Sequence, residues 1–229
     1  VPAAQPQPEL EPQPAPEPQP EPQPQPAPQP GGDWYRTGMP VPVANLAQLW
    51  VSPAGDDSNA GTQSRPLRNI QTAVDRANPG TTIYLTNGRW DGKGRSGLGW
   101  INFGPEDSGS PGKWVRLTAA PGASPRLVVQ QGEAIRVEGA YIEISGITIE
   151  GENAGPGNPT AATGAHYGYG ILVPHNDRFG QTTPAHHVVI VDNEVSGFAV
   201  SGIATDSANW VVVGGNTVHS NSNWGPEGG

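Results

Sequence analysis

The sequence predicts an all-β protein built as a parallel β-helix, a solenoid in which short strands stack coil upon coil. Three observations predict this fold: short β-branched runs punctuated by turn residues, a single convincing helical segment, and a repeat with a period of 23 residues. The chain has 229 residues, enough for one elongated domain and a tail.

The first element is a low-complexity arm, residues 1–32, made of Glu-Pro-Gln-Pro and Ala-Pro-Gln-Pro repeats. Proline fixes φ and has no amide donor, so this arm favours neither helix nor sheet. It has few apolar side chains to bury, and we expect a disordered, extended polyproline II segment. We interpret it as a spacer, with a ligand for a proline-recognition domain as the alternative. The β-helix domain then covers residues 33–229.

One helix is expected at Leu67–Ala77, where apolar residues recur at three- and four-residue steps until Asn78-Pro79-Gly80 ends the pattern. The other elements are short strands rich in valine and isoleucine. The expected strand-forming runs are Thr82–Leu85, Trp114–Leu117, Arg126–Val129, Ala134–Val137, Tyr141–Ile149, Gly170–Val173, His187–Val195, Gly202–Thr205 and Trp210–Val218.

The repeat places Ile149, Val195 and Val218 at equivalent positions, separated by 46 and then 23 residues. The longer separation is either two periods or one period that carries an insertion. A period near 23 residues suits one coil of a parallel β-helix, whose coils stack about 4.8 Å apart. Asn193 and Asn216 then occupy the same turn, and we expect their side chains to form an asparagine ladder between coils.

Each repeat is preceded by a shorter strand. Stacking these strands predicts inward ladders of Ile135, Ile171 and Ile203, and of Val137, Val173 and Thr205.

The segment Val51–Thr62, followed by Pro66, Ile70, Val74 and Pro79–Leu85, resembles the opening of secreted bacterial right-handed β-helix proteins. That group includes pectate, alginate and chondroitin lyases, and the resemblance extends from about residue 50 to the end of the chain. It implies a right-handed β-helix of the pectate lyase-like kind, with a short helix capping its N-terminal end. It also implies that the strands at Gly170-Ile171 and Gly202-Ile203 line a saccharide groove.

Composition excludes several functions. The formal net charge is −9 and the only lysines are Lys93 and Lys113, which disfavours nucleic-acid binding. No run of about 18 apolar residues suggests a membrane span, and the absence of cysteine excludes thiolate zinc sites. The resemblance implies a secreted or cell-surface protein. Since the chain begins at Val1 without a signal peptide, either that peptide was removed or the chain was cut there.

The resemblance also implies a chemistry, in which a calcium ion neutralises a uronate carboxylate, a basic side chain removes the C5 proton, and β-elimination follows. Arg136 is the basic candidate on the groove strands, and Glu138 and Asp206 at the strand ends are candidate calcium ligands. Candidate substrate contacts come from two loops beside the groove, namely His166, Tyr167, Tyr169, His175 and Arg178.

Each of these residues has an alternative interpretation. An arginine at position 136 also suits a carboxylate-binding or structural role, Glu138 and Asp206 suit solvated strand ends, and the loop residues suit simple packing. His186 and His187 are adjacent on a strand, where side chains alternate, so we expect them on opposite faces and not as joint metal ligands.

Two functions follow. The first is a secreted lyase that acts on an acidic uronate polysaccharide. It is expected to use calcium and to be a monomer when the chain is complete. The second is a non-catalytic, glycan-binding or adhesin-like surface protein. Because the chain stops at Gly229, where another strand is expected, further coils carrying a lysine base are predicted beyond it.

Overall fold

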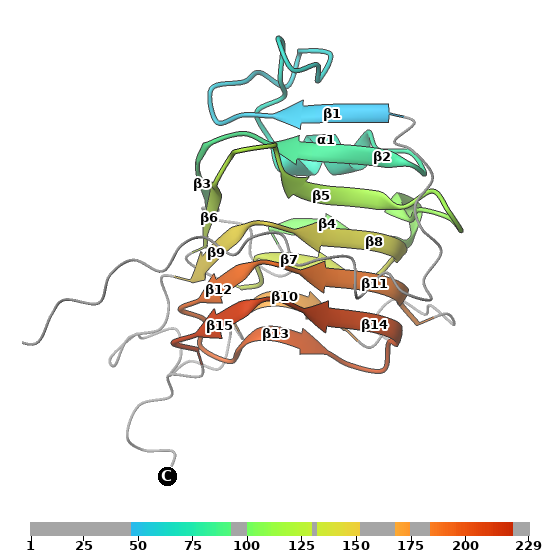
Figure 1. The fold of residues 1–229 in the computed structure, drawn as a ribbon, viewed down its shortest axis with the longest axis vertical. Helices are drawn as coiled ribbons and strands as arrows, with labels where there is room; N and C mark the ends of the chain where they lie inside the picture. The colour runs from blue at the N-terminus through green and yellow to red at the C-terminus, as the bar shows by residue number, and fades with distance from the viewer. Residues whose placement is uncertain (1–46, 93–99, 130–131, 152–167, 175–183, 222–229) are drawn as a thin grey trace, which may run out of the picture.

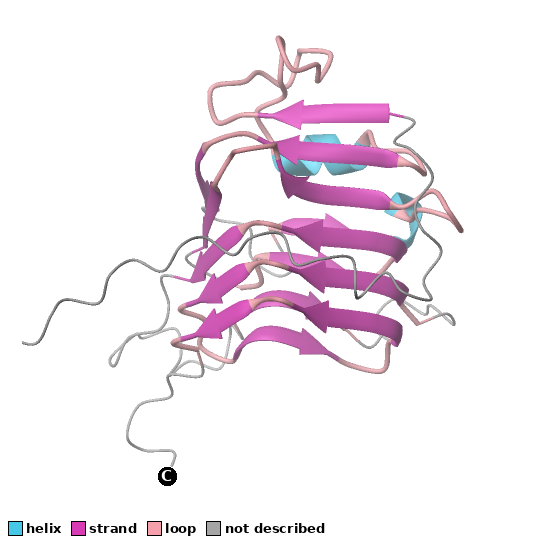
Figure 2. Ribbon diagram, in the orientation of Figure 1, coloured by secondary structure: helices cyan, strands magenta, loops and turns pink. Residues whose placement is uncertain are grey.

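The strands wind into a solenoid whose coils stack along the long axis of the molecule (Figure 1). The computed structural model describes residues 47–92, 100–129, 132–151, 168–174 and 184–221. Every strand pair is parallel, and almost all regular structure is strand (Figure 2). The chain is therefore a right-handed parallel β-helix, as predicted from its repeat and its resemblance.

Three sheets form the walls of the solenoid. The six-stranded sheet contains β1 (Ala47–Val51), β2 (Thr81–Leu85), β5 (Val115–Ala119), β8 (Ala140–Ser145), β11 (His186–Val191) and β14 (Asn209–Gly214). The five-stranded sheet contains β3 (Gly88–Gly92), β6 (Pro125–Val129), β9 (Thr148–Gly151), β12 (Glu194–Ser196) and β15 (Thr217–His219). The four-stranded sheet contains β4 (Ile101–Phe103), β7 (Ile135–Val137), β10 (Tyr169–Val173) and β13 (Ser201–Thr205).

Each long apolar run of the sequence divides into two strands at a sharp turn. In the three C-terminal coils, the turn opens with a residue at positive φ: Gly146 (69°), Asp192 (56°) and Gly215 (65°). This left-handed conformation redirects the chain from the six-stranded sheet to the five-stranded sheet within two residues. The repeating runs are therefore one strand of each sheet, joined by this turn.

The asparagine ladder is confirmed at the second position of this turn. Asn193 is fully buried, and its Nδ2 donates to Oδ1 of Asn216 at 3.0 Å and to the carbonyl of Ile144 at 3.1 Å. Its Oδ1 accepts from the amide of Ile147 at 3.1 Å, where the ladder begins. The asparagine side chains thus satisfy backbone groups that a tight buried turn would leave unpaired.

The isoleucine ladder of the four-stranded sheet is also confirmed. Ile171 is paired with Ile135 on one side and with Ile203 on the other. The next inward position pairs Val173 with Thr205. These ladders belong to one continuous apolar core that runs through the coils, which is how a repeat fold buries surface that a single coil could not.

The separation of 46 residues between Ile149 and Val195 is one period with insertions. β9 pairs directly with β12, so Ile149 and Val195 are neighbours in adjacent coils. The additional sequence lies at 152–167 and 175–183, outside the described residues. The inserted length therefore does not interrupt the stacking of the described strands.

The helix is shorter than predicted. α1 spans Ile70–Asp75, because the side chain of Asn69 caps its first turn by accepting from the amide of Gln71 at 3.0 Å. Leu67, expected inside the helix, instead forms a parallel bridge with Val51. The helix occupies the place of a strand next to β4, at the N-terminal end of the four-stranded sheet (Figure 1). Among the described residues, no helix is long and apolar enough to cross a membrane.

The prediction that His186 and His187 point to opposite faces is wrong. His187 has φ of 54°, which breaks the strand alternation, and the two Nδ1 atoms lie 2.8 Å apart. The equivalent residues of neighbouring coils, Tyr141 and Trp210, have φ of 56° and 55°. Their rings stack on that of His187, with centroids 4.6 and 5.8 Å away. Repeated left-handed positions thus build an external aromatic column.

Candidate functional site

The outer face of the four-stranded sheet carries a row with one residue from each strand. Register places Asn102 beside Arg136, Arg136 beside Leu172, and Leu172 beside Ala204. The predicted outward residues Arg136, Leu172 and Ala204 therefore do lie in a row. Asn102 was missed, because the three residues of β4 are too few to show a strand pattern in the sequence.

Arg136 is held between two carboxylates. Its Nε donates to Oε1 of Glu138 at 2.7 Å, and its Nη1 donates to Oε2 of Glu133 at 3.0 Å. The side chain of Arg136 is 3% exposed and that of Glu138 is 7% exposed. Both pairs are charge-assisted, and removing either partner would weaken the compensation of a buried charge.

This environment keeps Arg136 protonated. Burial alone would lower the pKa of its guanidinium, but the hydrogen bond that it donates to Glu138 and the charge of Glu133 outweigh burial and raise the pKa above its ordinary value. A general base must release its proton near the working pH. In this geometry Arg136 is suited to pairing with carboxylates, which was the alternative to a role as the base.

Asn102 sits one coil above Arg136 and is anchored through its backbone. Gln71 of α1 accepts from the amide of Asn102 at 2.8 Å and donates to its carbonyl at 3.0 Å. The side-chain Oδ1 of Asn102 is buried and has no hydrogen-bond partner among the described residues. A buried acceptor without a donor is costly, which makes Asn102 a position where a hydroxyl or a water is needed.

The two proposed calcium ligands do not meet. Glu138 and Asp206 occupy the same strand-end position two coils apart, with Pro174 between them. Their backbones are therefore separated by about 10 Å. Glu138 is bound to Arg136, and Asp206 is exposed. Within the described ranges, no group of three His, Cys, Asp or Glu residues is placed to hold a metal.

Of the predicted substrate contacts, one is described. Tyr169 begins β10, is half-buried, and pairs in register with Ser201. His166, Tyr167, His175 and Arg178 lie outside the described residues.

A further carboxyl lies where the chain leaves β4. Asp107, in the short 3-10 helix η2 (Pro105–Asp107), accepts from the amide of Gly104 at 2.8 Å and is 9% exposed. Burial raises the pKa of Asp107 to about 6, against the lowering effect of the Gly104 hydrogen bond. The sequence offered no signal for this residue, because its burial depends on how the turn packs.

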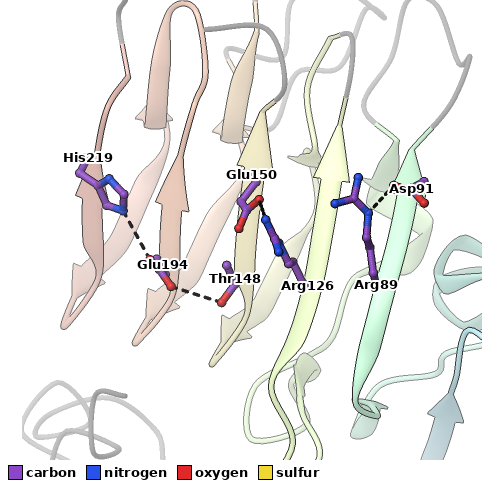
Figure 3. A network of polar contacts seen from close by, with 7 residues as sticks. All are labelled: Arg89, Asp91, Arg126, Thr148, Glu150, Glu194 and His219. Carbon is purple, nitrogen blue, oxygen red and sulfur yellow. Dashed lines mark hydrogen bonds and ion pairs between the residues drawn. The ribbon is translucent and has the colours of Figure 1, made fainter. Parts of the chain in front are cut away.

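The outer face of the five-stranded sheet has a different character (Figure 3). Arg89 pairs with Asp91 at 2.8 Å, Arg126 pairs with Glu150, and His219 approaches Glu194 at 3.4 Å. The side chains of Arg89, Asp91, Arg126, Glu194 and His219 are 45–49% exposed. Exposed pairs of this kind contribute about 0–1 kcal/mol each, so this face resembles an ordinary solvated surface and not a binding site.

Comparison with known proteins gives the architecture a family. The profile described as Pel9A-like, right-handed β-helix region matches residues 49–222. The chain belongs to this family. The match includes every strand of the four-stranded sheet and begins within β1, so residues 1–48 lie outside it.

Two curated proteins are similar in sequence. The pectate lyase PEL9 of Emericella nidulans is 49% identical over 49 residues, which is 21% of this chain and 12% of that protein. The uncharacterized protein YwoF of Bacillus subtilis is 26% identical over 157 residues, which is 65% of this chain and 28% of that protein. The chain thus spans less than a third of each relative's length.

Solved structures share the fold. Pectate lyase Pel9A superposes with a TM-score of 0.54 at 19% identity, covering 73% of this chain and 38% of that one. A rhamnogalacturonan lyase has a TM-score of 0.51 at 15% identity, covering 71% and 39%. The GH136 lacto-N-biosidase of Eubacterium ramulus has a TM-score of 0.53 at 15% identity, covering 69% and 30%. At these identities the likeness concerns the fold.

Proposed function

We propose that this chain is a secreted, polysaccharide-active β-helix protein that acts as a lyase on a uronate polymer, with the outer face of the four-stranded sheet as its substrate-binding face. The observation that carries the proposal is the family match over residues 49–222. The similar proteins include one named as a pectate lyase by sequence, and one named as a pectate lyase and one named as a rhamnogalacturonan lyase by structure.

The distribution of side chains supports the choice of face. The four-stranded sheet presents Asn102, with its buried and unpartnered Oδ1, directly beside the cation of Arg136. Tyr169, one of the predicted substrate contacts, begins β10 of this sheet and is half-buried. Aromatic rings contact sugar faces well.

The reaction in this proposal is β-elimination, in which a base removes a proton next to the uronate carboxylate and the glycosidic oxygen leaves. We assign no base to a described residue, because Arg136 retains its proton. Calcium enters as a condition to be varied, with Glu138 and Asp206, at strand ends two coils apart, as its candidate ligands.

A second candidate is a non-catalytic glycan-binding protein with the same binding face. The observation that favours it is the full engagement of Arg136 by Glu133 and Glu138, which removes the one basic candidate on the described strands of this sheet. Under this candidate the sheet binds an acidic polysaccharide without cleaving it.

The deciding experiment follows the ultraviolet absorbance of unsaturated uronate products. The 229-residue chain is incubated with polygalacturonate, alginate or chondroitin, each with calcium and with a chelator, and binding is measured in parallel. A calcium-dependent rise on one polymer is the expected result. Binding without a rise supports the glycan-binding candidate, and neither binding nor a rise overturns both.

Tyr169→Ala tests the binding face, with Tyr84→Ala as the matched control. Both tyrosines are half-buried strand residues, but Tyr84 lies on the six-stranded sheet, where it stacks on Trp50 with ring centroids 4.8 Å apart. We expect Tyr169→Ala to weaken binding about tenfold, as loss of an aromatic contact of roughly 1–1.5 kcal/mol would, and Tyr84→Ala to leave it unchanged. Equal effects would remove the four-stranded sheet as the binding face.

A further inference from the structure

The outer face of the six-stranded sheet is apolar over β11 and β14, whereas the outer face of the five-stranded sheet carries charged side chains. Two outward columns run across its strands in register. One column contains Gln48, Thr82, Arg116, Glu143, Val189 and Val212, and the other contains Trp50, Tyr84, Thr118, Ser145, Val191 and Gly214. In β11 the outward side chains are therefore Val189 and Val191, and the inward ones are Val188 and Ile190. A strand that is apolar on both faces is typical of a covered sheet.

Burial of this face agrees with its composition. Val189 is 4% exposed, Val191 is 0% exposed and Trp114 is 3% exposed, and the three form an apolar cluster separate from the solenoid core. Arg116 and Glu143 form an ion pair at 3.2 Å, with side chains 17% and 7% exposed. Five charged side chains on the outer face of the five-stranded sheet are 45–49% exposed, so coil neighbours alone do not bury an outward position on that sheet.

The described elements do not supply this cover. Every described strand belongs to one of the three sheets, and α1 lies beside β4 of the four-stranded sheet. The indole Nε1 of Trp114 is buried and, within the described residues, has no hydrogen-bond acceptor. An overlying chain would bring backbone carbonyls to this donor.

We propose that residues 33–46 of the same chain dock on the outer face of the six-stranded sheet. This segment leads directly into β1, the first strand of that sheet. Its sequence, Asp-Trp-Tyr-Arg-Thr-Gly-Met-Pro-Val-Pro-Val-Ala-Asn-Leu, is apolar and carries only Asp33 and Arg36 as charged residues. Residues 1–32, in contrast, offer mostly proline, glutamine and glutamate.

The reach of the segment is sufficient. Fourteen residues extend up to about 46 Å, whereas β14 lies five strand spacings from β1 in the sheet order, or about 24 Å. The segment can therefore pass over β11 and β14 with length to spare. Its prolines, Pro40 and Pro42, favour the extended conformation that such a path needs.

Docking has a consequence for the arm. Residues 1–32 would leave the solenoid from the six-stranded sheet, so that the outer face of the four-stranded sheet stays clear of the spacer. The segment lies outside the family match, which begins at residue 49, so docking would be a property added to the family's β-helix. It does not depend on the proposed lyase activity.

A disulfide scan tests the proposal, because the chain contains no cysteine. Ser145→Cys places a thiol on the six-stranded sheet, and Thr148→Cys, three residues later and equally half-buried, places one on the five-stranded sheet. Each is combined with one cysteine at Tyr35, Met39, Val41 or Val43 in the full chain. A disulfide forms only if the two Cα atoms come within about 7 Å.

The expected result is an intramolecular disulfide to position 145 from at least one segment position, at a yield at least tenfold above that to position 148. Equal yields, or none at any position, overturn the proposal. Disulfides that join two chains overturn it in favour of a second copy as the occupant. If circular dichroism shows that Ser145→Cys does not fold, Thr118→Cys, its neighbour in the same column, replaces it.

Discussion

The side chain of Gln71 pairs with the backbone of Asn102 as a strand would. Its Oε1 accepts from the Asn102 amide at 2.8 Å, and its Nε2 donates to the Asn102 carbonyl at 3.0 Å. Asn102 lies in β4, the edge strand of the four-stranded sheet, where such groups would otherwise remain open. The helix α1 thus ends this sheet with both apolar contact and a side-chain substitute for the missing strand.

Gln71→Ala should destabilise the protein by about 1–3 kcal/mol, because both backbone groups of Asn102 lose their partner in a half-buried place. The measurement is urea-induced unfolding followed by circular dichroism. Gln63→Ala is the matched control, since Gln63 is exposed on the loop before the helix, and its effect should stay within about 0.5 kcal/mol. Equal effects would show that the pairing does not stabilise the edge.

Asn193→Ala should cost more than Asn216→Ala. Asn193 is fully buried and joins Ile144, Ile147 and Asn216. Its loss strands buried backbone groups at about 1–3 kcal/mol each. Asn216 makes similar bonds from a half-buried position, where water can replace them in part. Unfolding free energies of the two variants give the comparison, and an equal loss would contradict the role of burial.

The repeat of Ile149, Val195 and Val218 predicted the register of the C-terminal coils correctly, because two of its three turns carry an asparagine that marks the same position. The first coils carry no such mark. β3 begins and ends with glycine and β4 has three residues, so neither shows a period. Boundaries of the helix also escaped prediction, since capping by Asn69 decides them.

The sequence predicted which residues form the outward row of the candidate site, but not the contacts that their side chains make. Alternation along the strand places Arg136 outward, yet only the fold brings Glu133 and Glu138 to its guanidinium. Likewise, sequence alternation separated His186 from His187, whereas a left-handed residue brought their rings together. Local backbone conformation and burial, which depend on neighbouring coils, are the parts that a linear pattern does not encode.

Arg136→Met should destabilise the protein by about 3–5 kcal/mol, because it removes the guanidinium that donates to the buried carboxylate of Glu138. Combining it with Glu138→Gln should recover part of this loss, and the double-mutant cycle in urea measures the coupling between the two side chains. Arg126→Met is the control. Its pair with Glu150 is half-exposed, so we expect a change below about 1 kcal/mol. A small effect at both arginines would mean that the Arg136 clamp does not stabilise the sheet.

Asp107 should make part of the stability depend on pH. Its pKa is raised by burial from an ordinary value of 3.8 to about 6, so the folded protein binds a proton between these values that the unfolded chain has released. The stability that this proton contributes is fully present below pH 3.8 and is lost as the pH rises through about 6. Asp107→Asn cannot ionise, and it should therefore become increasingly stable relative to the parent protein from pH 4 to pH 7.

Unfolding free energies at several pH values, measured for the parent and for Asp107→Asn, isolate this contribution because all other groups titrate in both proteins. Asp91→Asn serves as the control, since Asp91 is half-exposed and paired with Arg89 on the solvated face. Its difference from the parent should not grow across the same range. A difference for Asp107→Asn that stays constant or shrinks with rising pH would show that Asp107 is ionised in the folded protein, and that the turn after β4 tolerates its charge.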